Sequence, residues 1–398
     1  MLRLAALVVA AGFLFWFVTA VTVAGVFRDK APAWVLGIAP YDARANAQLA
    51  RQALTGRQDA AALAGAEALT VAALRRDPTV VEAVTALSLT YALRRQLARA
   101  ERGFAYAETL SRRDIGTQLW LIERNVQRND IGGALAHFDT ALRTSPQMAS
   151  TLYPVMASAS AEPAIAAELN RLLLTRPAWG RDFPLSLMAS QGDPRALYTV
   201  TRGLFRPSED HEREQLGLLL RKLTALHAYD YAWRAYVAAR PERRQSGGAL
   251  WNGDFSREIG LPPFDWTFPE NPAQVPERRP GPRGHVLALP AGLEETAEVA
   301  RQLIRLAPGR YRVAARVGNV GGDAALRPQL AISCAGAAPR ELARSDFPAA
   351  PETGAAMAVA FTVPAGCRYQ WLSILVRGSY DRQVETTSWI GAVRIGEP

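Results

Sequence analysis

The order of hydrophobic and polar positions divides the chain into three stretches of different character. From Leu4 to Phe27 no residue is charged and most are apolar. From about Asp42 to Arg244 apolar positions recur three and four residues apart, which is the period of an α-helix with one buried face. From about Leu250 onward they alternate with polar or small residues, which is the period of a β-strand.

These three patterns predict a multidomain α + β protein. We expect an N-terminal transmembrane signal anchor in residues 1–30, an α-helical repeat domain in residues 41–246 and a C-terminal antiparallel β-sandwich in residues 249–398. The adjacent Gly247 and Gly248 are typical of a hinge. Because 49% of the 398 residues are hydrophobic, wholesale disorder is excluded.

The apolar stretch at the N-terminus has the length of a membrane span. It comprises 24 residues, and a helix that rises about 1.5 Å per residue would cross the hydrocarbon core of a bilayer over that length. Secretory signal peptides have shorter apolar regions, so an uncleaved anchor is favoured, although Ala20 and Ala24 leave cleavage open. Positive charges flank the stretch on both sides and do not settle its orientation.

A period of 34 residues runs through the first part of the helical stretch. It is carried by small residues, by aromatic residues four positions after the first alanine, and by prolines that close repeats: Ala66, Ala100 and Ala134; Ala73, Ala107 and Ala141; Phe104 and Phe138; Pro78 and Pro146. Small residues allow two helices to approach closely, and proline cannot continue a helix. A supersecondary unit repeated in this way predicts stacked helical pairs, since no single pair can bury its apolar face alone.

Between Ala47 and Pro146 this pattern resembles the tetratricopeptide repeat (TPR). The resemblance implies a TPR-like solenoid whose groove binds a protein partner, and we take Arg57, Glu123 and Asn125 as candidate groove residues. A charged residue on a repeat helix is more often simply solvated, which is the alternative for each of them.

The match to the TPR family is incomplete in the first helix of each repeat. Val84 and Gln118 stand where the family often has tryptophan. Ser88 and Ile122 stand where it often has glycine. Beyond Pro146 the period decays, and further helices are expected without a clear repeat.

The C-terminal stretch predicts short strands separated by Gly and Pro turns, which are typical of a β-sandwich. The strands that we expect are Gln302–Leu306, Tyr311–Val317, Met357–Val363, Leu372–Val376 and Trp389–Ile395. A Pro-Gly turn at Pro308-Gly309 predicts that the first two of these form a hairpin.

The opening of this stretch and the hairpin resemble the galactose-binding-like jelly rolls, a fold that many carbohydrate-binding modules share. The features that carry the resemblance are the Asn252-Gly253-Asp254-Phe255 turn and a pattern that runs from Gln302 to Tyr311. The family often has a glutamate of a calcium site after the phenylalanine, but Ser256 follows Phe255 here, so no calcium site is carried over.

Five aromatic rings are candidates for glycan contact, because a flat ring packs against the apolar face of a pyranose. They are Trp251, Phe264, Trp266, Trp371 and Trp389. The alternative is that these rings belong to the sandwich core. For the stretch from Trp251 to Trp266, sealing the new core is the favoured interpretation.

The two cysteines, Cys334 and Cys367, lie in the predicted β domain without metal-binding spacing. The simplest interpretation is a disulfide, which indicates an oxidising compartment, and two buried free thiols are the alternative. With the apolar N-terminus, this favours a single-pass membrane protein with a short cytoplasmic end and a large periplasmic or extracellular body; the resemblance to bacterial proteins given below implies a bacterial inner membrane and a periplasmic bulk.

Charge does not indicate nucleic-acid binding. The net charge is +9, but all but two of the 46 basic residues are arginines, scattered beside acidic residues without a compact basic run. We therefore predict no nucleic-acid partner.

No catalytic motif appears in the sequence. The four histidines lie outside any metal or triad pattern, and Asp254, Asp265, Glu294 and Glu295 are candidates for acid catalysis only because they are acidic. We predict no enzymatic activity, no cofactor and no metal.

The layout is similar to a group of membrane-anchored bacterial proteins with TPR-like repeats and a C-terminal jelly roll, associated with cell-envelope or exopolysaccharide machinery. The resemblance implies a non-enzymatic envelope protein that binds a protein partner through its repeats and a polysaccharide or protein through its sandwich. The alternatives are a scaffold of a secretion or envelope complex without glycan binding and, third, a glycan-active enzyme. The sequence names neither the partner nor the glycan nor the oligomeric state.

Overall fold

The computed structural model divides into two compact units. It describes residues 2–56, 59–242, 250–321, 323–379 and 387–397, with the backbone alone for residues 2–10. The N-terminal unit comprises residues 1–155 and 176–181, and the C-terminal unit comprises residues 156–175 and 182–398. The predicted hinge at Gly247 and Gly248 lies outside the described residues, so the predicted domain limits stay predictions.

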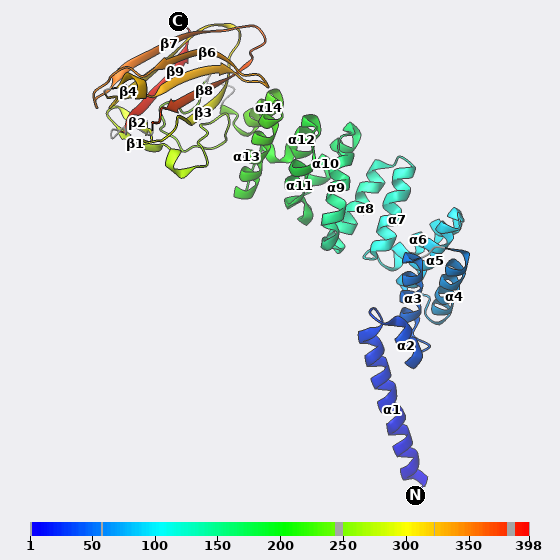
Figure 1. The fold of residues 1–398 in the computed structure, drawn as a ribbon. Coiled ribbons are helices and arrows are strands. Elements are labelled where there is room, and N and C mark those ends of the chain that lie inside the picture. Colours follow the sequence, from blue (N-terminus) through cyan, green and yellow to red (C-terminus); the bar gives the residue numbers. More distant parts are fainter. Residues whose placement is uncertain (1, 57–58, 243–249, 322, 380–386, 398) are drawn as a thin grey trace. The chain divides into compact units, whose positions relative to one another are not determined.

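The first part of the chain is helical, as the 3.6-residue period predicts (Figure 1). The α-helices are α1 (Leu2–Phe27), α2 (Pro32–Ile38), α3 (Ala43–Thr55), α4 (Ala60–Arg76), α5 (Val81–Leu93), α6 (Leu97–Leu110), α7 (Ile115–Gln127), α8 (Ile131–Thr144), α9 (Ala149–Ala159), α10 (Pro163–Leu173), α11 (Phe183–Ser190), α12 (Pro194–Val200), α13 (Asp210–Ala225) and α14 (Tyr229–Ala239). Short 3-10 turns at Pro146–Met148, Ala178–Arg181 and Thr201–Phe205 interrupt the later helices.

Helix α1 covers the apolar N-terminal stretch. Its described side chains are largely exposed, and they include Phe13, Trp16 and Phe17. Within the part of the chain that the structure describes, no helix is both long and apolar enough to span a membrane. The transmembrane anchor is therefore not supported by the described residues and stays a prediction.

Aspartates begin several of these helices. Asp59, Asp114 and Asp130 each accept a hydrogen bond from the backbone N–H three residues later, at 2.8–2.9 Å, which satisfies one of the free donors of a helix N-terminus. The carboxylate of Asp114 also accepts the hydroxyl of Thr85 on α5, at 2.9 Å. One cap thus starts α7 and connects it to the first helix of the preceding pair.

Helices α3 to α8 pack as three consecutive pairs, α3 with α4, α5 with α6 and α7 with α8. The alanines of the 34-residue period all lie in the second helices and are buried. Phe104 on α6 stacks on Trp120 of α7, with ring centroids 4.2 Å apart and ring planes 14° apart. The periodic aromatic residue Phe104 therefore fills the space toward the following pair. Membership in the TPR family stays a resemblance.

The departure from the repeat pattern at Ser88 has a structural counterpart in Gly103. Ser88 is buried on α5, and Gly103 faces it from α6. A Cβ on Gly103 would come within 2.0 Å of the Ser88 hydroxyl oxygen. In this pair, the glycine that allows the two helices to approach closely therefore lies on the second helix, α6.

We expect Gly103→Ala to lower the free energy of unfolding of the N-terminal unit by about 1–2 kcal/mol. Overpacking of this kind costs about 1–3 kcal/mol, and the better helix propensity of alanine returns up to about 1 kcal/mol. Chemical denaturation followed by helical circular dichroism measures the change. Adding Ser88→Gly should restore most of the packing energy, and a double variant no more stable than the single one would contradict this pairing.

The C-terminal part is an antiparallel β-sandwich of two sheets (Figure 1). Its strands are β1 (Glu277–Gly281), β2 (Gly284–Ala288), β3 (Ala297–Arg305), β4 (Gly309–Gly318), β5 (Gln329–Cys334), β6 (Arg340–Asp346), β7 (Ala355–Val363), β8 (Tyr369–Val376) and β9 (Trp389–Gly396). One sheet has the order β1-β2-β9-β4-β7, and the other has the order β3-β8-β5-β6. The predicted fold of a helical part followed by an antiparallel sandwich is confirmed.

The hairpin predicted around Pro308-Gly309 is wrong. β3 pairs with β8 in the four-stranded sheet, whereas β4 pairs with β7 and β9 in the five-stranded sheet. The Pro-Gly turn therefore crosses from one layer of the sandwich to the other. The sequence did not reveal this, because both strands alternate in the same way and each turns its apolar face to the shared core.

The core lies between the two sheets. Along β7 buried and exposed residues alternate almost perfectly, and Met357, Val359, Phe361 and Val363 point inward. Such alternation is expected of a strand that covers one face of a core and exposes the other. Phe255 and Trp266, from the stretch before β1, complete this core.

The opening turn is held against β9 by close backbone contact. The Gly253 carbonyl accepts the N–H of Val393 at 2.8 Å. A Cβ at Gly253 would lie 2.1 Å from the Val393 carbonyl oxygen, so only glycine fits this approach. Next to it, the buried Gln302 side chain on β3 accepts the N–H of Trp251 at 3.0 Å and donates to the Trp251 carbonyl at 2.9 Å.

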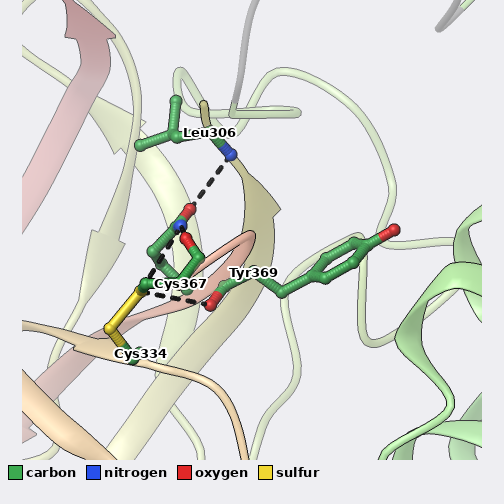
Figure 2. The surroundings of a disulfide bond; sticks show 5 residues. Leu306, Cys334, Cys367 and Tyr369 are labelled. Atoms are coloured by element: carbon green, nitrogen blue, oxygen red, sulfur yellow. Dashed lines mark hydrogen bonds between the residues drawn. A yellow bond between two sulfur atoms is a disulfide. The ribbon is translucent and has the colours of Figure 1, made fainter. Parts of the chain in front are cut away.

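The predicted disulfide is present (Figure 2). Cys334, at the end of β5, is bonded to Cys367, just before β8, and their Cα atoms lie 5.5 Å apart. The buried Gln370 secures the surroundings: its amide donates to the Cys367 carbonyl, and its oxygen accepts the N–H of Leu306 at 3.0 Å. The bond thus sits where strands of the four-stranded sheet are already paired.

Candidate functional site

The structure separates the five candidate rings into two groups. Four are buried, with exposed fractions of 8%, 1%, 0% and 3% for Trp251, Phe264, Trp266 and Trp389. Trp371 is the exception, since it is only partly buried. A buried ring offers no face to a sugar, so we assign the four to packing and retain Trp371 as the ring that can contact a ligand.

Trp266 and Trp251 attach the opening stretch to the sandwich. The Trp266 ring lies 5.2 Å from the Phe255 ring, and its indole N–H donates to the Asn252 carbonyl at 3.0 Å. The guanidinium of Arg257 lies over the Trp251 ring at 4.6 Å from its centroid. The favoured sequence interpretation, in which these rings seal the new core, agrees with this geometry.

Phe264 is buried against α14, which belongs to the same unit. Its ring centroid lies 5.2 Å from that of Trp233 and 5.0 Å from that of Tyr236. Beside these rings, the Tyr369 hydroxyl donates to Asp230 at 2.9 Å. Burial, followed by the hydrogen bond to Asp230, raises the pKa of Tyr369 above its ordinary value. This group of rings is therefore a packing contact between α14 and the sandwich.

Trp389 lies on the five-stranded sheet, on the side away from the core. A Cβ at Gly318 would come within 2.2 Å of its ring, and a Cβ at Gly354 would come within 2.5 Å. The two glycines make room for the indole on β4 and before β7. Its burial thus depends on residues far apart in the sequence.

Trp371 lies on the outer face of the four-stranded sheet. On β8 its neighbours Leu372 and Ile374 belong to the core, so Trp371 points to the opposite side. It pairs with Leu303 on β3 and with Ser333 on β5. The guanidinium carbon of Arg301 lies over the ring at 4.5 Å from the centroid.

Planar polar side chains occupy the other end of the same face. Gln329 donates to Asp346 at 2.7 Å and accepts from Arg344 at 3.0 Å, while Arg377 also donates to Asp346 at 2.9 Å. Hydrogen bonds of this kind fix the donors and acceptors in place. The face therefore combines one partly exposed indole with preorganised groups that can bind hydroxyls, which is the composition typical of small-molecule and sugar sites.

The candidate groove residues are not brought together into a described site. Arg57 lies outside the described residues. Glu123 is exposed on α7 and accepts from Gln127 at 3.2 Å, and Asn125 is half-buried and donates to the Leu121 carbonyl at 2.9 Å. Both contacts lie within one helix, so the partner groove stays a prediction.

Two of the acidic candidates for catalysis, Asp254 and Asp265, hold the conformation of the opening stretch. Asp254 accepts from the N–H and hydroxyl of Ser256. The buried Asp265 accepts the N–H groups of Gly260 at 2.8 Å and Trp266 at 2.9 Å. These bonds hold the opening stretch in its turn and loop conformation.

The described histidines and acidic residues form no metal centre. Across the described residues, no three or more histidine, cysteine, aspartate or glutamate side chains are grouped to hold a metal ion. His137 on α8 contacts the Gln118 side chain at 2.8 Å. Burial lowers the pKa of His137, which favours its neutral form inside the repeat helices.

Comparisons with known proteins give structural likenesses to the C-terminal β part. No family model and no curated protein matches the chain. A structure described as "CBM4 structure and function" is 13% identical, with a TM-score of 0.29, and covers 37% of this chain and 99% of its own. A CBM6 module of lichenase 5A from Cellvibrio mixtus, in complex with cellotriose, is 12% identical, with a TM-score of 0.23, and covers 34% and 98%.

A third similar structure is the C-terminal CBM6 of LamC from Zobellia galactanivorans. It is 15% identical, with a TM-score of 0.22, and covers 31% of this chain and 88% of its own. These structures are carbohydrate-binding modules. At such identities and TM-scores they assign no function to this chain.

Sequence reasoning identified Trp371 but not the residues around it. Arg301, Gln329, Arg344 and Asp346 were not singled out. The signal that could have found them is the alternation of β6, where Glu341, Arg344 and Asp346 share one face across a bulge. A strand that consists mostly of charged and polar residues, such as β6, is easily interpreted as a loop from the sequence.

Proposed function

We propose that this is a non-enzymatic cell-envelope protein whose β-sandwich binds a glycan on the outer face of the four-stranded sheet. The observation that carries the proposal is Trp371, the partly exposed indole on a face that also carries hydrogen-bonded polar side chains. An aromatic face attracts the slightly positive C–H groups of a pyranose, and planar polar side chains bind its hydroxyls.

The ion pairs of this face support a role in binding. Glycosidic cleavage requires two carboxyl groups on opposite sides of a bond, one of them protonated. On this face the carboxylates pair with arginines instead: Glu298 with Arg301, and Glu341 with Arg344. These ion pairs occupy the carboxylates, which supports a binding role.

The disulfide and the N-terminal stretch support a place outside the cytosol. Structural disulfides persist in oxidising compartments. The apolar side chains of α1 are exposed to an extent that a water-soluble helix avoids. We propose that α1 anchors the chain in a bacterial inner membrane, with the helical repeats and sandwich in the periplasm, and that the protein assists polysaccharide synthesis or export.

In this proposal the helical repeats bind a protein partner, and the sandwich holds the glycan. Stacked helical pairs present extended surfaces suited to a protein partner. The partner and the glycan would then be held by one anchored chain. A scaffold that lacks glycan binding is the competing outcome of the experiment below.

We expect Trp371→Ala to weaken glycan binding by about tenfold or more, since loss of a central aromatic contact costs a large part of the binding energy at such sites. The full-length protein and the variant are compared on a glycan array and by calorimetry with the best ligand. Trp34→Ala, which removes an exposed tryptophan of α2, is the matched control.

Two results would contradict the proposal. One is that the full-length protein binds none of the envelope polysaccharides on the array, which would favour the scaffold. The other is that Trp371→Ala binds as tightly as wild type. Trp371→Phe keeps a ring and should retain part of the affinity, which separates loss of stacking from loss of folding.

A further inference from the structure

The outer face of the five-stranded sheet carries a column of arginines. Along β4, Val313 and Val317 belong to the core, so Arg310 and Arg312 point away from it. On the neighbouring β9, Arg394 is exposed and pairs with Ala314 of β4. We call Arg310, Arg312 and Arg394 the arginine face.

Sheet geometry fixes the spacing of these charges. Alternate residues on one strand lie about 7 Å apart, which separates Arg310 from Arg312. Arg394 lies diagonally across from Arg312, where side chains are about 7–8 Å apart. The three guanidinium groups are therefore carried by a rigid framework of two paired strands.

Small residues surround the arginine face. On β7, Ala358 and Ala360 pair with Ala314 and Arg312, and both are exposed. On β9, Gly396 pairs with Arg312. The long arginine side chains thus rise from a low, uncharged surface that leaves their planar groups accessible.

The arginine face lacks the acidic partners that arginines have elsewhere on the sandwich. On the outer face of the other sheet, Arg301, Arg344 and Arg377 each form an ion pair. Within the described residues, neither an ion pair nor a hydrogen bond is formed by the side chains of Arg310 and Arg312, or by that of Arg394. The acidic residues Glu352 and Glu397 lie outside the strands, and both are exposed.

Unpaired like charges on one rigid face repel each other and do not stabilise the fold. Their arrangement is suited to anions, because guanidinium binds carboxylates and phosphates through two parallel hydrogen bonds. We propose that the arginine face binds a linear anionic polysaccharide, with the arginines forming fork-like contacts to carboxylates of successive uronic acid residues.

The surroundings favour a polysaccharide over other polyanions. Binding of single-stranded nucleic acid relies on aromatic stacking, and the exposed residues around the arginine face are alanine, glycine and threonine. Binding to a lipid surface relies on apolar side chains that insert, and none accompany these arginines. The assignment of an anionic ligand rests on the charge and geometry of the arginine face alone. The choice of a polysaccharide among anionic ligands also rests on the proposed place of the protein outside the cytosol.

The experiment measures binding of the full-length protein to immobilised polygalacturonate and to dextran as a neutral polymer, at about 0.1 M salt. The test variant is Arg310→Gln with Arg312→Gln and Arg394→Gln. The control is Arg278→Gln with Arg283→Gln and Arg340→Gln, which removes the same charge from exposed positions elsewhere on the sandwich. We expect the test variant to bind polygalacturonate at least about tenfold more weakly, and the control to bind as wild type does.

A third variant separates shape from charge. Replacing the same three arginines by lysine keeps the charge but removes the planar fork, so affinity should fall between the wild type and the glutamine variant. Equal losses in the test and control variants would show non-specific attraction and overturn the proposal. So would failure of the wild type to bind polygalacturonate, or tighter binding through these arginines to oligonucleotides or anionic vesicles.

The two faces of the sandwich can be tested independently. Trp371 lies on the other sheet, so Trp371→Ala tests the outer face of the four-stranded sheet, and the glutamine variant tests the arginine face. If Trp371→Ala abolishes polygalacturonate binding and the glutamine variant does not, the arginine face is refuted while glycan binding at Trp371 stands. Thermal unfolding of each variant confirms that it is folded.

Discussion

Trp266→Ala is expected to lower the free energy of unfolding of the C-terminal unit by about 3–5 kcal/mol. The Trp266 side chain is fully buried in the sandwich core beside Phe255. Its removal leaves a large cavity and deprives the Asn252 carbonyl of its indole donor. Chemical denaturation, with hydrogen exchange of the strand peptides to assign the transition to this unit, measures the loss.

Trp266→Phe serves as the conservative comparison. It keeps most of the ring volume but loses the indole N–H, so it should cost about 1–3 kcal/mol, less than the alanine variant. A Trp266→Ala protein with wild-type stability and reduced glycan binding would show instead that this ring contacts ligand. The comparison with Trp371→Ala thus separates the packing rings from the exposed one.

Loss of the Cys334–Cys367 disulfide is expected to destabilise the C-terminal unit by about 3–4 kcal/mol. The bond closes a loop between residues separated by 33 positions, and closing a loop of that size removes this amount of chain entropy from the unfolded state. The double variant Cys334→Ser with Cys367→Ser and the reduced wild-type protein should unfold at the same denaturant concentration. Both should unfold at a lower denaturant concentration than the oxidised protein.

The control is the response to reductant. The stability of the double variant should not change with reductant. The stability of the wild-type protein should fall to that of the variant. A wild-type protein purified from its host with free thiols at both positions would contradict the proposed oxidising compartment. A reduced protein as stable as the oxidised one would contradict the entropic account.

The strands predicted most clearly from the sequence are those in which apolar residues alternate with polar or small residues without interruption. Tyr311–Val317 became β4 and Met357–Val363 became β7, because each covers one face of the core along its whole length. The strands it did not name have weaker patterns. β1 contains Pro280 within a proline-rich connection, and β6 carries charges and a bulge.

The helical repeats could be predicted from the sequence because their small residues recur wherever two helices are in contact. Ala66, Ala100 and Ala134 recur every 34 residues and are all buried, since each stands where two helices touch. The pairing of Ser88 with Gly103 was not visible. It depends on which residue of one helix faces which residue of the other, and that register is set by tertiary packing.

The candidate site was only partly predictable for a similar reason. Trp371 and Trp389 both occur in strands and look alike in the sequence. What distinguishes them is cross-strand context: Trp389 is accommodated by Gly318 and Gly354, whereas Trp371 meets Arg301. Gly318 and Trp389 are 71 positions apart in the chain, and Arg301 and Trp371 are 70 positions apart. The arginine face escaped notice because alternating arginines look unremarkable in an arginine-rich chain.

The disulfide also bears on how the sandwich avoids self-association. The covalent loop from Cys334 to Cys367 contains β6 and β7, which are the outermost strands of the two sheets on one side and contact each other. β6 is charged, but β7 has nine residues without a charge and leaves one row of backbone groups unpaired. Unprotected edges of this kind recruit further strands. Without the bond, this loop would no longer be tied at both ends to the paired strands, so we expect the reduced protein to aggregate more readily than the oxidised protein.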